Sequence, residues 1–233
     1  EKERSVGLGV MGFHSYLQQH SIPLESVMSK AWNKKIFKHI QEHVDQASKD
    51  LADERGPCPD AADYGYNERF SNKTAIAPTA SISIICGGAS PGVEPVAANS
   101  YTHKTLSGSF NVRNRYLVEL LEKHGKNTDD VWSGITTNQG SVSHLDFLTD
   151  LEKDVFKTAF ELDQKWIIEL SGDRTPYISQ AQSINLFVPA DIHKRELHKI
   201  HFDAWKKGLK SLYYCRSKSI QRAENVNDTK ATD

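Results

Sequence analysis

The chain has 233 residues, of which 38% are hydrophobic and 25% are charged, and its formal net charge is −1. A chain of this length can bury a substantial core, and its near-neutral charge gives no electrostatic reason to expect a nucleic-acid or membrane-surface partner. Three scattered cysteines, Cys58, Cys86 and Cys215, lack CxxC spacing, which argues against a zinc site or a disulfide framework. The charged, Met-less start carries no signal-peptide pattern, so we expect a cytoplasmic protein whose N-terminus is processed or internal to a longer polypeptide.

Two helical patterns open the chain. Residues 6–19 are apolar with closely spaced glycines, which suggests a helix lying against another backbone. Apolar residues at helical spacing follow over 23–51, and Gly56-Pro57 predicts the end of that long helix. His39 and His43 stand one turn apart on it, and without a third ligand of suitable spacing we interpret them as a solvated face.

The stretch around which the chain is organised begins as an apolar run that stops at Pro78 and continues with small hydroxyl residues. No charged side chain occurs over 75–93. The prolines, glycines and serines in this stretch exclude a membrane span, because lipid cannot satisfy the backbone groups that they free. We interpret it as buried backbone with a turn after Pro78, where converging amides form an anion site for phosphate. An ordinary buried turn is the alternative.

The remaining elements alternate between helix and strand. After the polar, extended stretch 99–111 we predict helices over 113–124 and from 129, and then a helical region over 150–170 that a Thr149/Glu152 capping box opens and Gly172 breaks. A strand over 183–188 and a strand over 209–215 follow, with a helix between them that Asp191 caps. The residues of this helix predicted to face inward are Ile192, Leu197, Ile200, His201, Ala204 and Trp205. With the strand at 74–78, this order predicts an α/β chain with parallel strands. So few strands in so long a chain indicate part of a larger sheet or barrel, incomplete on its own.

Five blocks, in this order, carry a resemblance to a known family. They are residues 75–83 (AIAPTASIS), 91–95 (PGVEP), 106–110 (LSGSF), 180–186 (QAQSINL) and 204–214 (AWKKGLKSLYY). Together they resemble the C-terminal part of the large, catalytic subunit of class I ribonucleotide reductase, over about residues 4–216. The resemblance implies the C-terminal half of a ten-stranded α/β barrel, and a role in reducing ribonucleoside diphosphates to deoxyribonucleoside diphosphates by radical chemistry.

The resemblance also implies which residues bind the substrate. The loop formed by Pro78, Thr79, Ala80, Ser81 and Ile82 corresponds to the loop that holds the substrate diphosphate in the family. Its main-chain amides and the hydroxyls of Thr79 and Ser81 would hold the phosphates. Some family members carry Glu in place of Ala80, a departure that backbone binding tolerates.

The two adjacent tyrosines near the C-terminus acquire a role in the same way. By the resemblance, Tyr213 and Tyr214 match the pair that relays the radical from the small subunit to the catalytic cysteine. Without the family context, two tyrosines in a strand reflect ordinary β-propensity. The helix over 192–207 matches the region where the tail of the small subunit docks, with simple barrel packing as an equal alternative.

The family's catalytic and reducing cysteines, its effector-binding elements and its activity domain lie upstream of the matched region. We therefore expect this chain to need a companion carrying the N-terminal half, as one part of a split large subunit or as a fragment of an intact one. We expect no cofactor and no metal site on this chain. A dimetal–tyrosyl radical cofactor is expected on the partner small subunit, and nucleotide effectors are expected on the N-terminal half. Thioredoxin or glutaredoxin is a further expected partner. The tail 217–233 is polar and predicted to be disordered, and it lacks the family's redox cysteine pair.

Two other functions stay open from sequence alone. A class II reductase, which uses adenosylcobalamin, needs no small subunit and would have no use for the tyrosine pair. A non-catalytic half that retains only nucleotide or partner binding is the second alternative, and the intact loop and tyrosine pair argue against it.

Overall fold

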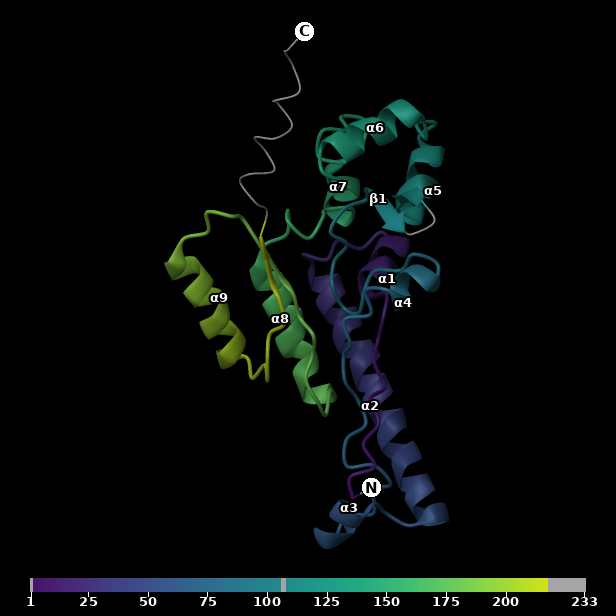
Figure 1. Ribbon diagram of the computed structural model, residues 1–233, viewed down its shortest axis with the longest axis vertical. Coiled ribbons are helices and arrows are strands. Elements are labelled where there is room, and N and C mark those ends of the chain that lie inside the picture. The colour runs from purple at the N-terminus through teal and green to yellow at the C-terminus, as the bar shows by residue number, and fades with distance from the viewer. Residues whose placement is uncertain (1, 106–107, 218–233) are drawn as a thin grey trace.

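The computed structural model describes residues 2–105 and 108–217. Its helices are α1 (Phe13–Gln19), α2 (Val27–Arg55), α3 (Pro59–Asp63), α4 (Ile82–Ile85), α5 (Arg115–Lys123), α6 (Asp129–Thr137), α7 (Asp150–Val155), α8 (Gln164–Arg174) and α9 (Lys194–Lys206), with a 3₁₀ turn at Thr175–Tyr177. Its strands are β1 (Ser100–Thr105), β2 (Gly108–Arg113), β3 (Leu186–Val188) and β4 (Cys215–Ser217). The long helix α2 runs along the molecule, with α3 at one end and α5, α6 and α7 gathered at the other (Figure 1).

Four segments that are distant in sequence pair in parallel. A bridge joins Leu8 to Thr74, a second joins Ile76 to Gln182, and β3 pairs with β4 in the register Leu186 to Cys215. The mixed helix and strand content and the parallel pairing of these segments confirm the α/β prediction at this level. The predicted strand over 74–78 is reduced to two isolated bridges, and the hairpin of β1 and β2 is antiparallel, which the sequence did not indicate.

The glycines near the N-terminus serve this pairing. The Leu8 amide donates to the Lys73 carbonyl and the Leu8 carbonyl accepts from the Ala75 amide, each at 2.9 to 3.0 Å, so the backbone here is extended. A Cβ placed on Gly9 would lie 2.5 Å from the carbonyl oxygen of Ala75. The predicted close approach to another backbone is therefore correct. The predicted helix is wrong before Phe13, because these residues form backbone bonds to a neighbouring segment instead.

The long helix follows its sequence signals closely. The Ser26 hydroxyl caps α2 by accepting from the Ser29 amide at 3.1 Å, and Gly56 ends the helix at a φ of 79°. His39 and His43 lie exposed on it, as predicted, with a ring nitrogen of His43 against the His39 carbonyl.

One buried cation fastens α2 to α8. Arg174 is 1% exposed and donates to Gln182, Asn33 and Ser171 at 2.7 to 2.9 Å, with the rings of Phe13 and Phe37 beside its guanidinium. Burial lowers the pKa of this guanidinium to about 9. A buried charge is tolerated only when its hydrogen bonds are satisfied, so this cluster ties both helices to the strand segment at Gln182.

Two helix boundaries differ from the predictions. The single helical region over 150–170 is two helices, with the capping box of Thr149 and Glu152 opening α7 as predicted. Helix α8 continues through Gly172 to Arg174, so the predicted break at Gly172 is wrong. A Cβ on Gly172 would lie 2.9 Å from the Cβ of Lys207, so glycine here permits the close approach of α8 to the end of α9.

The last helix is capped and oriented differently from its prediction. His193 caps α9, by accepting from the Arg195 amide at 3.2 Å, and the predicted cap Asp191 does not. Ala204 is buried, but Trp205 is 70% exposed and His201 is exposed, so these two predicted inward positions are wrong. The buried stripe is narrower than the apolar pattern because only one side of α9, at Ile200 and Ala204, packs on Ile168 of α8 and Leu186 of β3.

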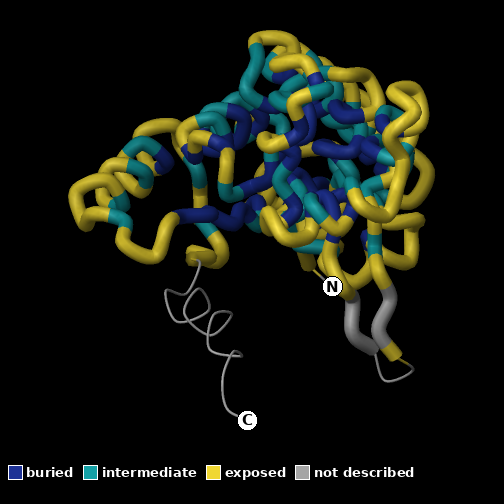
Figure 2. The backbone as a smooth tube through the Cα atoms, turned by 90° about the horizontal axis from the view of Figure 1, so that it is seen from above, coloured by how far each residue is buried: buried dark blue, intermediate teal, exposed yellow. Residues whose placement is uncertain are grey.

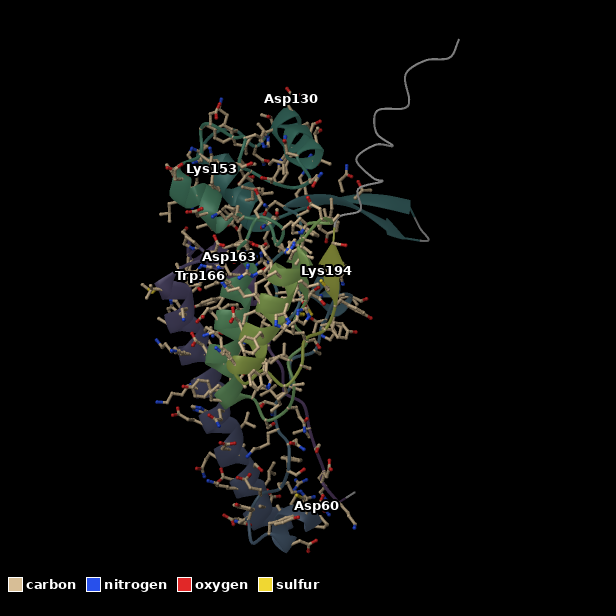
Figure 3. The ribbon with its side chains drawn as sticks, turned by 90° about the vertical axis from the view of Figure 1, so that its left-hand side faces the viewer. Asp60, Asp130, Lys153, Asp163, Trp166 and Lys194 are labelled. Carbon is tan, nitrogen blue, oxygen red and sulfur yellow. The ribbon has the colours of Figure 1, made fainter. Side chains whose placement is uncertain are left out.

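Buried residues lie toward the middle of the molecule, and exposed ones line its outside (Figure 2). A second core fills the lobe of α5, α6 and α7, around Leu117, Leu121, Trp132 and Ile135. Figure 3 shows this lobe, labelled at Asp130 and Lys153, at the end of the molecule opposite Asp60. Ser217, the first residue of the predicted tail, closes β4, and the rest of that tail lies outside the described residues.

Replacing Gly9 with Ala should lower the free energy of unfolding by about 1–3 kcal/mol, because the new Cβ meets a backbone carbonyl that cannot yield. Gly7→Ala is the matched control, since its Cβ would meet the Ala75 Cβ at an ordinary 3.6 Å. Urea unfolding followed by circular dichroism measures both. Equal stability of the two variants would contradict this account of the parallel pairing.

The buried imidazole of His14 predicts an acid-dependent loss of stability. Its Nδ1 accepts from the Val96 amide at 3.1 Å, and burial lowers its pKa from 6.5 to about 4. Because the unfolded chain binds this proton more readily, stability is fully present above pH 6.5 and is lost as the pH falls toward 4. Urea midpoints at pH 7 and pH 5 should differ less in His14→Gln than in the native chain.

Candidate functional site

The loop after Pro78 is shaped by one hydrogen bond to a distant glycine. The Thr79 hydroxyl oxygen accepts from the Gly92 amide at 2.7 Å, and Thr79 itself has a φ of 50°. A Cβ on Gly92 would lie 2.9 Å from the carbonyl oxygen of Ala77, so only glycine permits this approach. Since the Thr79 oxygen accepts this bond, its hydroxyl hydrogen remains available to donate to a ligand.

Consecutive amides at the turn have no protein partner. Within the described residues, the backbone amides of Ala80, Ser81 and Ile82 donate no hydrogen bond, and all three residues are exposed at the start of α4. The arrangement therefore offers accessible donors to an anion, as the sequence predicted. The predicted burial of this stretch is correct at Ile76 and Val93, which are buried, but wrong at α4, where Ile82 and Ile85 are 57% and 84% exposed.

A cavity of about 440 Å³ connects this loop to the end of β4. Its lining residues are Pro78, Ala80, Pro91, Glu94, Pro95, Ala97, Phe160, Asn185, Phe187, Arg216 and Ser217. Arg216 comes two residues after Tyr214, so the cavity brings the predicted phosphate loop close to β4, which directly follows the tyrosine pair. Neither tyrosine lines the cavity itself.

The tyrosines pack directly on each other. The ring centroids of Tyr213 and Tyr214 are 4.1 Å apart, inclined at 51°, and the two hydroxyl oxygens are 3.5 Å apart. About half of each side chain is exposed. The hydrogen bond to Tyr214 raises the pKa of the Tyr213 phenol above its usual value.

A buried carboxylate beside this pair was not singled out from the sequence. Glu94 is 6% exposed and accepts from the Asn185 amide and from Asn185 Nδ2, at 3.0 and 2.9 Å. Burial raises the pKa of this carboxyl, although the bonds from Asn185 oppose the shift. One signal in the sequence marks it: Glu94 is the first charged residue after the uncharged run 75–93.

Within the described residues, no group of three or more His, Cys, Asp or Glu side chains is placed to hold a metal ion. Cys58 is buried, whereas Cys86 and Cys215 are exposed. No helix in the described ranges has the length and hydropathy needed to cross a bilayer.

The family model for the ribonucleotide reductase barrel domain matches residues 1–68 and 60–215. The chain belongs to this family. It is 49% identical over 231 residues to the ribonucleoside-diphosphate reductase large subunit of Invertebrate iridescent virus 6. That alignment covers 97% of this chain and 24% of the relative. It is 40% identical over 228 residues to the putative large subunit of Frog virus 3, covering 98% of this chain and 40% of that relative.

A solved structure shares the fold as well. The class Id ribonucleotide reductase alpha subunit of Actinobacillus ureae superposes with a TM-score of 0.86 at 40% identity, covering 94% of this chain and 40% of that one. These findings confirm the predicted resemblance to the large subunit of the reductase. The chain spans well under half the length of each of these relatives.

Removing the Thr79 hydroxyl should loosen the loop of this reductase segment. Thr79→Val keeps the β-branched shape but leaves the Gly92 amide without its acceptor, so the free energy of unfolding should fall by about 1–3 kcal/mol. Hydrogen exchange measured by mass spectrometry should speed up in the peptide containing Gly92. Thr79→Ser, which keeps the hydroxyl, should exchange like the native chain, and fast exchange in both variants would contradict the assignment.

Proposed function

We propose that this chain is the part of a ribonucleoside-diphosphate reductase that binds the substrate diphosphate and carries the final tyrosines of the radical relay. The observation that carries the proposal is the packed tyrosine pair beside a cavity that the phosphate loop also lines. The enzyme would reduce ribonucleoside diphosphates to deoxyribonucleoside diphosphates, in the cytoplasm, for DNA synthesis.

The substrate diphosphate would lie on the loop of Pro78, Thr79, Ala80, Ser81 and Ile82. The free amides of Ala80, Ser81 and Ile82 support this role, and the Thr79 and Ser81 hydroxyls add donors. Arg216, across the same cavity, supplies a positive charge that phosphate oxygens favour.

The tyrosine pair would move one electron and one proton in each step. When a phenoxyl radical forms on one tyrosine, it takes a hydrogen atom from the phenol of the other, so one phenol is regenerated and one radical remains. The two oxygens lie 3.5 Å apart. Direct passage of the proton would require them to approach to about 2.6–3.2 Å in the assembled enzyme. A phenylalanine at either position keeps the ring and removes the transferable hydrogen.

The four parallel segments would form part of a ten-stranded α/β barrel that the rest of the large subunit completes. The catalytic cysteines and the effector sites would lie on that remaining part, whether it is a separate chain of a split subunit or continuous with this one. The exposed apolar face of α4 at Ile82 and Ile85 supports this, because the remaining part of the large subunit would bury it. We also propose 217–233 as a polar tail.

The further partners follow from the same assignment. The small subunit would carry the dimetal–tyrosyl radical cofactor and would dock its tail along the outer edge of α9, where Phe202 and Trp205 are exposed and pack together. Thioredoxin or glutaredoxin would restore the reducing thiols, which this chain does not supply.

A non-catalytic half that only binds nucleotide or partner is the second candidate. The free amides of the loop fit both functions, whereas the packed tyrosines are needed only for the radical reaction. The same pair disfavours an adenosylcobalamin-dependent class II enzyme, which has no radical to receive from a small subunit.

Tyr214→Phe tests the relay in the complete large subunit assembled with its small subunit. Turnover should fall by about a hundredfold or more, because the phenol that passes the hydrogen is gone, while subunit assembly and substrate binding stay unchanged. Tyr64→Phe is the matched control, since Tyr64 is 81% exposed at the end of α3. Undiminished turnover in Tyr214→Phe would refute the relay and favour the binding half.

A further inference from the structure

The tyrosine pair depends on an irregularity in the strand that carries it. Successive residues of a regular strand point to opposite faces of the sheet, so two adjacent tyrosines would not meet. Here their ring centroids are only 4.1 Å apart. The predicted regular strand over 209–215 is accordingly wrong, and β4 begins only at Cys215.

The backbone bonds show the nature of the irregularity. In a regular parallel ladder one residue would both donate to the Ile184 carbonyl and accept from the Leu186 amide. In this structure Tyr213 donates to Ile184 at 2.8 Å, and Tyr214 accepts from Leu186 at 2.9 Å. Two residues therefore stand opposite Asn185, which defines a β-bulge, and bulges re-aim side chains beside active sites.

The bulge leaves the amide of Tyr214 without a ladder partner, and a side chain takes that place. Asn185 Oδ1 accepts from the Tyr214 amide at 3.0 Å. The amide group of Asn185 is oriented in turn by Glu94, whose two carboxylate oxygens accept from the Asn185 backbone amide and from its Nδ2. Both residues are buried, 3% exposed for Asn185 and 6% for Glu94, so water does not readily replace either contact.

We propose that Glu94 and Asn185 are positioning residues for the radical relay: they hold the bulge that stacks Tyr213 on Tyr214. This inference rests on the proposed function for its consequence in turnover, but the stacking itself can be measured separately. Both residues also line the cavity beside the phosphate loop, but the positioning role requires neither to contact the substrate or exchange a proton. Their contribution is to fix which atoms of the backbone at Tyr214 face β3.

The donor and acceptor pattern allows a reciprocal exchange. Glu94→Gln places a donating NH₂ group against one of the two donors of Asn185, its backbone amide or its Nδ2. Asn185→Asp places a second carboxylate against that of Glu94. Each single change therefore breaks a buried contact. In the double variant Glu94→Gln/Asn185→Asp the Gln oxygen accepts from the backbone amide at position 185. Its NH₂ donates to one Asp oxygen, and the other Asp oxygen accepts from Tyr214. All three contacts are restored in mirrored form.

The experiment uses the complete large subunit assembled with its small subunit, carrying 3-fluorotyrosine at position 214. The single variants should shift or broaden the fluorine NMR line and lower kcat about tenfold or more, with little change in the KM for the diphosphate. The double variant should recover the native line and most of the native kcat. Recovery in the double variant would establish coupling between the two side chains.

A matched control separates positioning from general loss of stability. Asn99 is equally buried, at 1% exposed, and donates to the carbonyls of Gly140 and Phe156 in the other lobe. Asn99→Ala should lower stability but leave the fluorine line and the kcat of the folded enzyme unchanged. A native fluorine line in both single variants, or a double variant no better than the singles, would overturn the proposal. If Tyr214→Phe leaves turnover intact, the proposed function fails while the fluorine spectra still decide the positioning role.

Discussion

The structure depends on parallel backbone pairing between segments that lie far apart in the chain. The bridges at Leu8 and Thr74 and at Ile76 and Gln182, followed by the pairing of β3 with β4, bring four segments from different parts of the chain together. The bulge with the tyrosines lies just before β4, at its amino end. The loop after Pro78 lies at the carboxyl end of its own segment. In α/β proteins ligands bind at that edge of the sheet.

A buried polar framework keeps the pairing in register. Arg174 joins α2 and α8 to the segment at Gln182, and Glu94 joins the loop of 91–95 to the segment at Asn185. In each case a charged group is buried among directed hydrogen bonds, and such a group tolerates few alternative arrangements. The helices supply the apolar cover, while these polar contacts determine which backbone atoms face one another.

Local signals in the sequence predicted local features well. The ends of α2 follow from the capping serine, the apolar period and Gly56, and the box of Thr149 and Glu152 opens α7 as expected. Features that depend on distant partners were missed. Gly172 looked like a helix breaker, but it lies within α8, where its missing side chain makes room for Lys207. The apolar residues around Gly9 were predicted to be helical. Their backbone bonds to residues 73–75 produce no periodic pattern in the sequence, so the extended conformation could not be predicted. Among the site residues, the loop and the tyrosines were recognisable by resemblance, whereas Glu94 and Asn185 become meaningful only through their contact with each other.

The parallel pairing also governs how such a chain reaches its folded state. Residues near Leu8 can pair only after the segment at Thr74 has been synthesised, and β3 can pair only after β4 has been synthesised. Contacts between residues so distant in sequence form slowly, because a long loop must close before any bond compensates for the lost chain entropy. During synthesis the unpaired edges and the apolar face of α4 are open to other chains, so production at low temperature should favour correctly folded material.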